Sequence, residues 1–382
     1  RIETGQLTTN TSVKVMNAKG EVIENERITK ILGFRGLNRV PLESAEAGDI
    51  IAIAGLKKAT VADTIAVPSV VAPIAAQPID PPTLSMTFSI NDSPLAGLEG
   101  KKLTSRMVAD RLFKEAEGNV SIKITQSEDK DSFDVAGRGE LQLGVLIETM
   151  RREGFELSIS RPRVLFQTNE KGQKLEPIEE AVIDVDDEYV GTVVESLSKR
   201  KGDLIEMRPS GGGKTRVIFH IPSRGLIGYH GQFLTETRGT GVMNRIFHSY
   251  GDYRGEITTH RRGALISTEN GDAVAYALWN LEERGTMFIS PGDKVYLGMV
   301  IGENSRDNDL EVNPLKGKQL TNMRASGKDE AVKLTPPKAM TLEQAISYIQ
   351  DDERVEVTPK TIRIRKAILC PHERKKASRT KE

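Results

Sequence analysis

Cysteine is almost absent from this chain, which has one, Cys370, among 382 residues. A single cysteine excludes an internal disulfide framework and indicates a reducing compartment. Long apolar runs are also missing, because none approaches the roughly 20 residues that a membrane-spanning helix needs. Net charge is zero, since 54 Lys and Arg balance 54 Asp and Glu. The sequence therefore predicts neither a secreted disulfide scaffold nor a membrane span.

Aromatic residues are scarce, at 5% of the chain, whereas glycine is frequent, with 34 residues. This composition favours several small β-rich or α+β modules over one large enzyme core. The length predicts roughly two to four domains. The chain begins without methionine and in a strand-like pattern, so we expect it to be a piece of a longer protein.

Residues 1–78 have the pattern of short strands at 12–16, 26–34 and 49–54, separated by Gly, Asn and Pro turns. These strands predict a partial β-barrel. The segment 72–82 holds four prolines, which disfavour both helix and central strand. A domain boundary is therefore expected there.

The order β-α-β-β-α-β is expected twice in succession, which is the split-βαβ or ferredoxin-like motif. The first module, 82–164, has strand patterns at 83–90, 120–125, 132–136 and 155–160 and helix patterns at 104–116 and 140–152. The second module, 172–254, has strand patterns at 177–185, 203–207, 216–221 and 242–249 and helix patterns at 190–199 and 225–236.

Residues 255–382 predict a mostly β C-terminal domain with one clear helix, a long loop and a basic tail. The helix should begin at Thr341, because Thr341 and Gln344 have the spacing of a capping box. Residues 303–333 are polar and show no helical or strand periodicity, which is typical of a functional or disordered loop. The tail from Lys360 holds nine Lys and Arg against two Asp and Glu, and we expect disorder after Pro371. Strands are expected at 264–268, 273–278, 287–289, 295–301, 355–357 and 361–369.

Positive charge is concentrated between residues 198 and 262, where twelve Lys and Arg stand against five Asp and Glu. A basic, glycine-punctuated βαβ unit favours contact with a polyanion, most often RNA. An ordinary α+β domain with a solvated basic face has the same pattern, and this alternative stays open. The stretch also holds four of the five histidines, which are His220, His230, His248 and His260.

Several short motifs are candidate sites of chemistry. Residues 211–215 resemble a phosphate loop, but Arg208 stands where that motif needs its first glycine, so a hairpin tip is predicted. A D-x-x-G match at 134–137 predicts a strand-to-helix turn. The histidines have no metal-ligand spacing and no cysteine beside them. A carboxylate cluster allows a divalent-ion site, although a solvated strand end is favoured: Asp184, Asp186, Asp187 and Glu188.

The order of the modules resembles the part of a translational GTPase that follows its GTP-binding domain. Residues 82–164 resemble domain III of elongation factor G, through the stretch DSFDVAGRGELQLGVLIETMRREGF at 131–155. Residues 175–253 resemble its domain V, through EPIEEAVIDVDDEYVG at 176–191 and RGTGVMNRIFHSYGDY at 238–253. Domain IV of that factor is missing between the two modules. This absence, the stretch SRGLIGYHGQFLTETRGTGV and the extension 256–382 resemble the BipA/TypA family.

The resemblance implies that the parent protein binds and hydrolyses GTP with Mg²⁺ in a domain outside this chain. The chain itself would then have no catalytic residue, no cofactor and no metal. The implied partners are the bacterial ribosome, through rRNA, A-site tRNA and ribosomal proteins, with roles in large-subunit assembly and stress adaptation. A cytoplasmic monomer without membrane contact is expected.

The residues expected to contact nucleic-acid phosphates are cations at helix ends, on a strand and in the long loop. Two other hypotheses stay open, namely a self-contained enzyme that uses the histidine-rich module on RNA or a nucleotide, and a protein-interaction adaptor. The end of a helix at 199–201 also suits basic residues because of the helix dipole. The predicted contacts are Lys199, Arg200, Lys201, Arg238, Arg245, Lys316, Lys318, Arg324 and Lys328.

Overall fold

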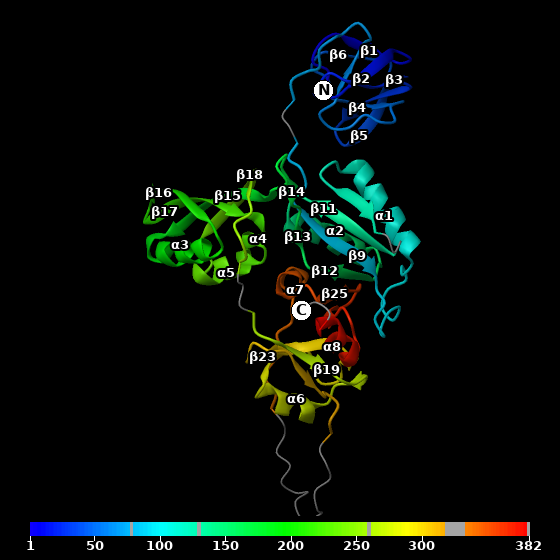
Figure 1. Cartoon of the computed structure of the whole chain (residues 1–382). Coiled ribbons are helices and arrows are strands. Elements are labelled where there is room, and N and C mark those ends of the chain that lie inside the picture. Colours follow the sequence, from blue (N-terminus) through cyan, green and yellow to red (C-terminus); the bar gives the residue numbers. More distant parts are fainter. Residues whose placement is uncertain (77–78, 128–130, 258–260, 318–332, 380–382) are drawn as a thin grey trace, which may run out of the picture. The chain divides into compact units, whose positions relative to one another are not determined.

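The computed structural model describes residues 1–76, 79–127, 131–257, 261–317 and 333–379. The chain forms two compact units, Arg1–Asp80 and Pro81–Glu382 (Figure 1). Sheets predominate over helices in both, so the predicted α+β class is confirmed. Among the described helices, none is long and apolar enough to cross a membrane.

The first unit consists of eight short strands in three small sheets, and residues 1–76 do not close into a barrel. The predicted strand at 26–34 is wrong, because the chain divides there into β3 and β4. The amide of Ile28 donates to Thr11 and that of Thr29 to Ala54, so their hydrogen bonds lead to different sheets. The strands are β1 (Gln6–Thr8), β2 (Ser12–Met16), β3 (Val22–Arg27), β4 (Lys30–Arg35), β5 (Asn38–Leu42), β6 (Ser44–Glu46), β7 (Ile51–Ala54) and β8 (Thr64–Ala66).

The first module of the second unit follows the predicted element order. Its strands lie in the antiparallel order β10-β11-β9-β12, and α1 and α2 supply apolar side chains to a shared core with Phe88 and Phe133. The predicted strand-to-helix turn lies at 138–139 and not at 134–137, because residues 134–137 form the end of β11 and α2 begins at Glu140. The elements are β9 (Leu84–Ile90), α1 (Ser105–Gly118), β10 (Lys123–Gln126), β11 (Ser132–Gly137), α2 (Glu140–Arg152) and β12 (Leu157–Ser160).

The sheet of this module continues into the C-terminal part of the chain. Strand β12 pairs antiparallel with β25, with Leu157 opposite Val357, and the sheet then runs through β26, β23, β19 and β24. One hydrophobic core crosses the junction, since Ile159 and Val355 belong to the same buried cluster. The strands that extend this sheet are β13 (Arg163–Val164), β19 (Ala264–Ser267), β21 (Gly285–Met287), β23 (Met299–Asn304), β24 (Leu310–Val312), β25 (Glu353–Val357) and β26 (Ile362–Lys366). Strands β20 (Gly271–Asp272) and β22 (Lys294–Val295) pair with each other in a separate small sheet.

Several predictions for the C-terminal part are wrong. The predicted strand at 295–301 divides into β22 and β23, which lie in different sheets. Residues 273–278, also predicted as a strand, run into the first half of helix α6 (Ala275–Glu282), which buries Ala277 and Leu278. Strand β24 lies inside the stretch 303–333 predicted as loop, and it pairs parallel with β19. The tail predicted to be disordered forms α8 (Pro371–Arg379), whose Arg374 bonds to Glu311 at 3.0 Å. Together with α7 (Leu342–Tyr348), the described part of this region has three helices rather than one.

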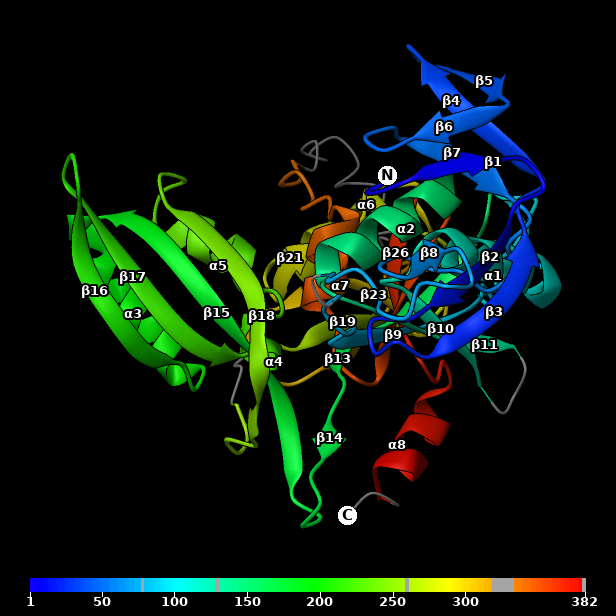
Figure 2. The same cartoon turned by 90° about the horizontal axis from the view of Figure 1, so that it is seen from above.

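The second module again follows the predicted element order, with strands in the order β16-β17-β15-β18 (Figure 2). The predicted helix at 225–236 is wrong in one respect, because it breaks at Gly228, where φ is +71°. The predicted hairpin tip is confirmed, since Gly211 pairs with Lys214. The elements are β14 (Gln167–Thr168), β15 (Lys174–Asp186), the 3₁₀ turn η1 (Asp187–Tyr189), α3 (Val190–Lys199), β16 (Asp203–Gly211), β17 (Lys214–Pro222), α4 (Ser223–Leu226), α5 (Tyr229–Glu236) and β18 (Val242–Asp252).

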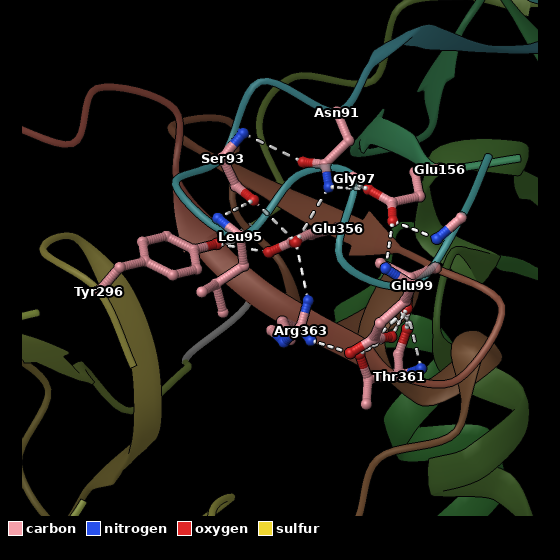
Figure 3. A network of polar contacts seen from close by, with 12 residues as sticks. Asn91, Ser93, Leu95, Gly97, Glu99, Glu156, Tyr296, Glu356, Thr361 and Arg363 are labelled. Atoms are coloured by element: carbon pink, nitrogen blue, oxygen red, sulfur yellow. Dashed lines mark hydrogen bonds and ion pairs between the residues drawn. The ribbon is translucent and has the colours of Figure 1, made fainter. Parts of the chain in front are cut away.

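A buried polar network fixes the loop 91–100 against β12, β25 and β26 (Figure 3). Glu156 is fully buried and accepts hydrogen bonds from the amides of Gly97 and Gly100, at 2.9 and 2.6 Å. Burial alone would raise the pKa of Glu156, but these hydrogen bonds lower it. Glu356, also fully buried, accepts from Arg363 at 2.8 Å. The network therefore ties the first module to the C-terminal strands by more than the β12–β25 pairing.

The capping box of α7 allows a direct test of the fold. The Thr341 hydroxyl accepts from the Gln344 amide at 3.3 Å, and the Gln344 side chain accepts from the Thr341 amide at 3.1 Å, as predicted. Thr341→Ala should lower the free energy of unfolding by about 1 kcal/mol, whereas Thr341→Ser should retain most of the stability. Urea unfolding of the whole chain, followed by the fluorescence of Trp279, measures both. Equal midpoints for the alanine variant and the parent chain would contradict the capping role.

Candidate nucleic-acid interface

The second module presents one covered and one open sheet face. Helices α3, α4 and α5 cover one face, where residues such as Ile183, Phe219 and Tyr229 are fully buried. On the open face, acidic residues of β15 stand opposite basic residues of β17. The basic stretch predicted from the sequence is thus divided between a core-facing side and a solvent-facing side.

The carboxylates of β15 are neutralised by their cross-strand neighbours. Asp184 bonds to Arg216 at 2.8 Å, and Asp186 bonds to Lys214 at 3.0 Å. Asp187 accepts from the Thr215 hydroxyl at 2.7 Å. Within the described residues, no group of three or more His, Cys, Asp and Glu could hold a metal ion. The open face is therefore lined by charge pairs between neighbouring strands. Nothing in the described residues supports the alternative of a divalent-ion site at this cluster.

Two of the histidines lie against each other on the open face. The ring centroids of His220 and His248 are 4.1 Å apart, and His220 Nε2 lies 3.4 Å from a carboxylate oxygen of Glu180. The sequence could not show this contact, because it depends on how β17 and β18 flank β15. His372 lies on α8, and His260 lies outside the described residues.

Two of the nine predicted contact residues are held inside the second unit by hydrogen bonds and ion pairs. Arg200 donates to the Gly225 carbonyl at 2.8 Å and to Gln232 at 2.6 Å, and its guanidinium lies 4.8 Å from the Tyr229 ring centroid. Burial lowers the pKa of Arg200. Arg245 lies 3.7 Å from carboxylate oxygens of both Glu140 and Glu179. Their side chains are engaged in packing α5 and joining the modules.

The other predicted cations differ in their surroundings. Lys199 is exposed but bonds to Glu195 at 2.6 Å. Lys201, Arg238 and Lys316 are exposed. Lys201 and Arg238 adopt left-handed backbone angles, with φ of 66° and 49°, where helices α3 and α5 end. The other three predicted contacts, Lys318, Arg324 and Lys328, lie outside the described residues.

A cluster of aromatic rings and cations lies where the sequence predicted no contact residues. Lys174 Nζ lies 3.6 Å from the Phe166 ring centroid and 4.8 Å from that of Tyr253, and both rings are partly exposed. The Arg224 guanidinium lies 4.7 Å from the Tyr253 ring. Exposed rings next to cations are a recurring feature of surfaces that stack nucleic-acid bases. Aromatic residues beside the β14–β15 hairpin were the available signal, but only the fold brings Phe166 and Tyr253 together.

Comparison with known proteins assigns the modules. Residues 1–66 match the model of elongation factor Tu domain 2, and residues 173–261 match that of the elongation factor G C-terminus. These two regions are thus modules of the elongation-factor class. Residues 262–371 match the TypA/BipA C-terminal domain.

The chain belongs to the TypA/BipA family. It is 49% identical over 99% of its length to the large ribosomal subunit assembly factor BipA of Escherichia coli, and 50% identical over 99% to that of Salmonella typhimurium. The factor of the same name from Bacillus subtilis is 43% identical over the whole chain. The chain spans 62% of the length of each of these relatives.

The adjacent cations Lys199 and Arg200 should respond differently to substitution. Arg200→Gln leaves the Gly225 carbonyl without its donor and should cost about 1–3 kcal/mol of unfolding free energy. Lys199→Gln removes an exposed ion pair and should stay within about 0.5 kcal/mol of the parent chain. Urea unfolding of the two variants makes the comparison. Equal losses would show that Arg200 has no special role in packing α5.

Proposed function

We propose that this chain is the ribosome-binding portion of a BipA/TypA-like translational GTPase that acts in assembly of the large ribosomal subunit. The observation that carries the proposal is similarity along the whole chain to factors named for that assembly. GTP and Mg²⁺ would be bound by residues outside this chain. The partners would be rRNA, A-site tRNA and ribosomal proteins, met in the cytoplasm by a monomer, with a role in stress adaptation.

We infer four domains, at 1–78, 82–164, 172–254 and 255–382. The two central domains would be ferredoxin-like. Support comes from their matching element orders and antiparallel strand orders, β10-β11-β9-β12 and β16-β17-β15-β18. The module matched to the elongation factor G C-terminus supports the same assignment for 172–254.

Contact with RNA would come from cations that the fold leaves exposed. Lys201, Arg238 and Lys316 meet this condition, and Lys318, Arg324 and Lys328 are predicted to join them. Lys199 would exchange its exposed partner Glu195 for a phosphate. Arg200 and Arg245 would act indirectly, by holding the module in shape. The Phe166–Tyr253 cluster would add base stacking beside the phosphate contacts.

The salt dependence of ribosome binding tests this proposal. Each phosphate contact releases counterions, so the affinity should fall steeply as salt rises. The double variant Lys201→Gln/Arg238→Gln should reduce the slope of log K against log salt by about 2. A control with the same charge change on exposed helix positions, Lys114→Gln/Arg152→Gln, should keep the slope. Co-sedimentation with ribosomes at several salt concentrations gives these slopes.

Three results would contradict the proposal. Binding that does not change with salt would favour a protein-interaction adaptor. Equal slopes for both double variants would remove Lys201 and Arg238 from the interface. Turnover of RNA or a nucleotide by this chain alone, lost in His230→Ala or His248→Ala, would favour the self-contained enzyme.

A further inference from the structure

Three arginines from three strands share one face of the large sheet, opposite the core cluster that contains Val355 and Ile364. Arg354 of β25 pairs with Arg365 of β26, and on its other side with Ser160 of β12. Directly paired residues in an antiparallel sheet lie on the same face. Their chain neighbours Val355 and Ile364 point into the core on the other face.

Arg163 of β13 joins this group from the neighbouring edge. It pairs with Ser85 of β9, the strand whose Ser89 pairs with Ser158 of β12. The strand register therefore places Arg163 on the same face of the sheet as Arg354. Arg163 is exposed. We call Arg163, Arg354 and Arg365 the arginine cluster.

The arginine cluster is short of hydrogen-bond acceptors. Arg354 donates to the backbone carbonyls of Asp351 and Glu353, at 3.2 and 2.8 Å. Arg365 donates to the Asp92 carboxylate and to the Ser158 hydroxyl through one nitrogen. The Nε of Arg365 has no partner within the described chain, although this residue is only 4% exposed. A buried donor without an acceptor is costly and rare.

The electrostatics of the arginine cluster also favour an added anion. Burial lowers the pKa of Arg354, and the charges of Arg163 and Arg365 lower it further. Asp351 and Asp352 oppose this effect but do not reverse it. Asp92 balances one of the three charges through a side chain that is 67% exposed. An excess of positive charge therefore remains on a partly buried surface, where solvent screens it weakly.

We propose that the arginine cluster binds a phosphate group of an RNA backbone. Phosphate offers several acceptor oxygens, and guanidinium groups bind such oxygens in pairs with charge-assisted hydrogen bonds. A bound phosphate would accept from the exposed Arg163 and the partly exposed Arg354. Its negative charge would also offset the positive charge of Arg365 beside them. The choice of RNA rests on the proposed function, whereas the phosphate site rests on the geometry alone.

Inorganic phosphate tests the site itself. The thermal unfolding midpoint of the whole chain should rise with phosphate, at constant ionic strength set by chloride, and reach saturation. Arg163→Gln should raise the half-saturating phosphate concentration about tenfold, which corresponds to one lost charge-assisted hydrogen bond. Arg354→Gln should do the same, and Arg152→Gln, on the helix-covered side of the same module, should not. Because Arg163 is exposed, its variant should fold normally. Equal saturation curves for all four proteins would overturn the site.

Ribosome binding tests the ligand. Arg163→Gln should reduce the salt slope of ribosome binding by about 1, and Arg152→Gln should leave it unchanged. A variant that loses phosphate binding but keeps the parent salt slope would overturn RNA as the ligand. A parent chain that binds phosphate through Arg163 but does not bind ribosomes at low salt would refute the proposed function and leave the anion site standing.

Discussion

Buried carboxylates are the constraint that organises the second unit, because a charge removed from water must be paired and hydrogen-bonded. Four glutamates among the residues that the structure describes are fully buried, and each is contacted by arginine, lysine or backbone amides. A large share of the positive charge of this unit is therefore engaged in ion pairs within the fold. Glu353, for example, contacts both Arg261 and Lys366. The buried set consists of Glu156, Glu176, Glu353 and Glu356.

This constraint separates two kinds of cation that look alike in the sequence. Arg224 and Arg261 serve Glu176 and Glu353 and hold strands together. Lys201 and Arg238 meet no such demand and stay exposed. The arginine cluster is the opposite case, since no buried carboxylate of the described residues forms an ion pair with its arginines. Glu356, on the same strand as Arg354, pairs with Arg363 instead. Counting charges along the sequence therefore overestimates how many cations of the basic stretch are available to RNA. The same count gives no sign of the arginine cluster on the large sheet.

The sequence predicted those parts of the fold that depend on local pattern. Helix α2 at 140–152 and helix α3 at 190–199 have the predicted bounds, because their apolar spacing and following turns are local signals. The apolar run at 273–278 was too short to tell helix from strand. The roles of Arg200 and Arg245 could not be predicted, because their partners Gly225 and Glu140 lie far away in the chain. The phosphate-binding role of any residue stays a prediction.

Residue-level footprinting tests most directly the claim that cations left over from the fold bind the ribosome. Lysine and arginine side chains would be modified chemically in the free chain and in the ribosome-bound chain and quantified by mass spectrometry. The account predicts that Arg224 and Arg261 react poorly in both states. It predicts that Lys201, Arg238 and Arg163 react in the free chain and are protected in the complex. Unchanged reactivity of these three residues on binding would contradict it.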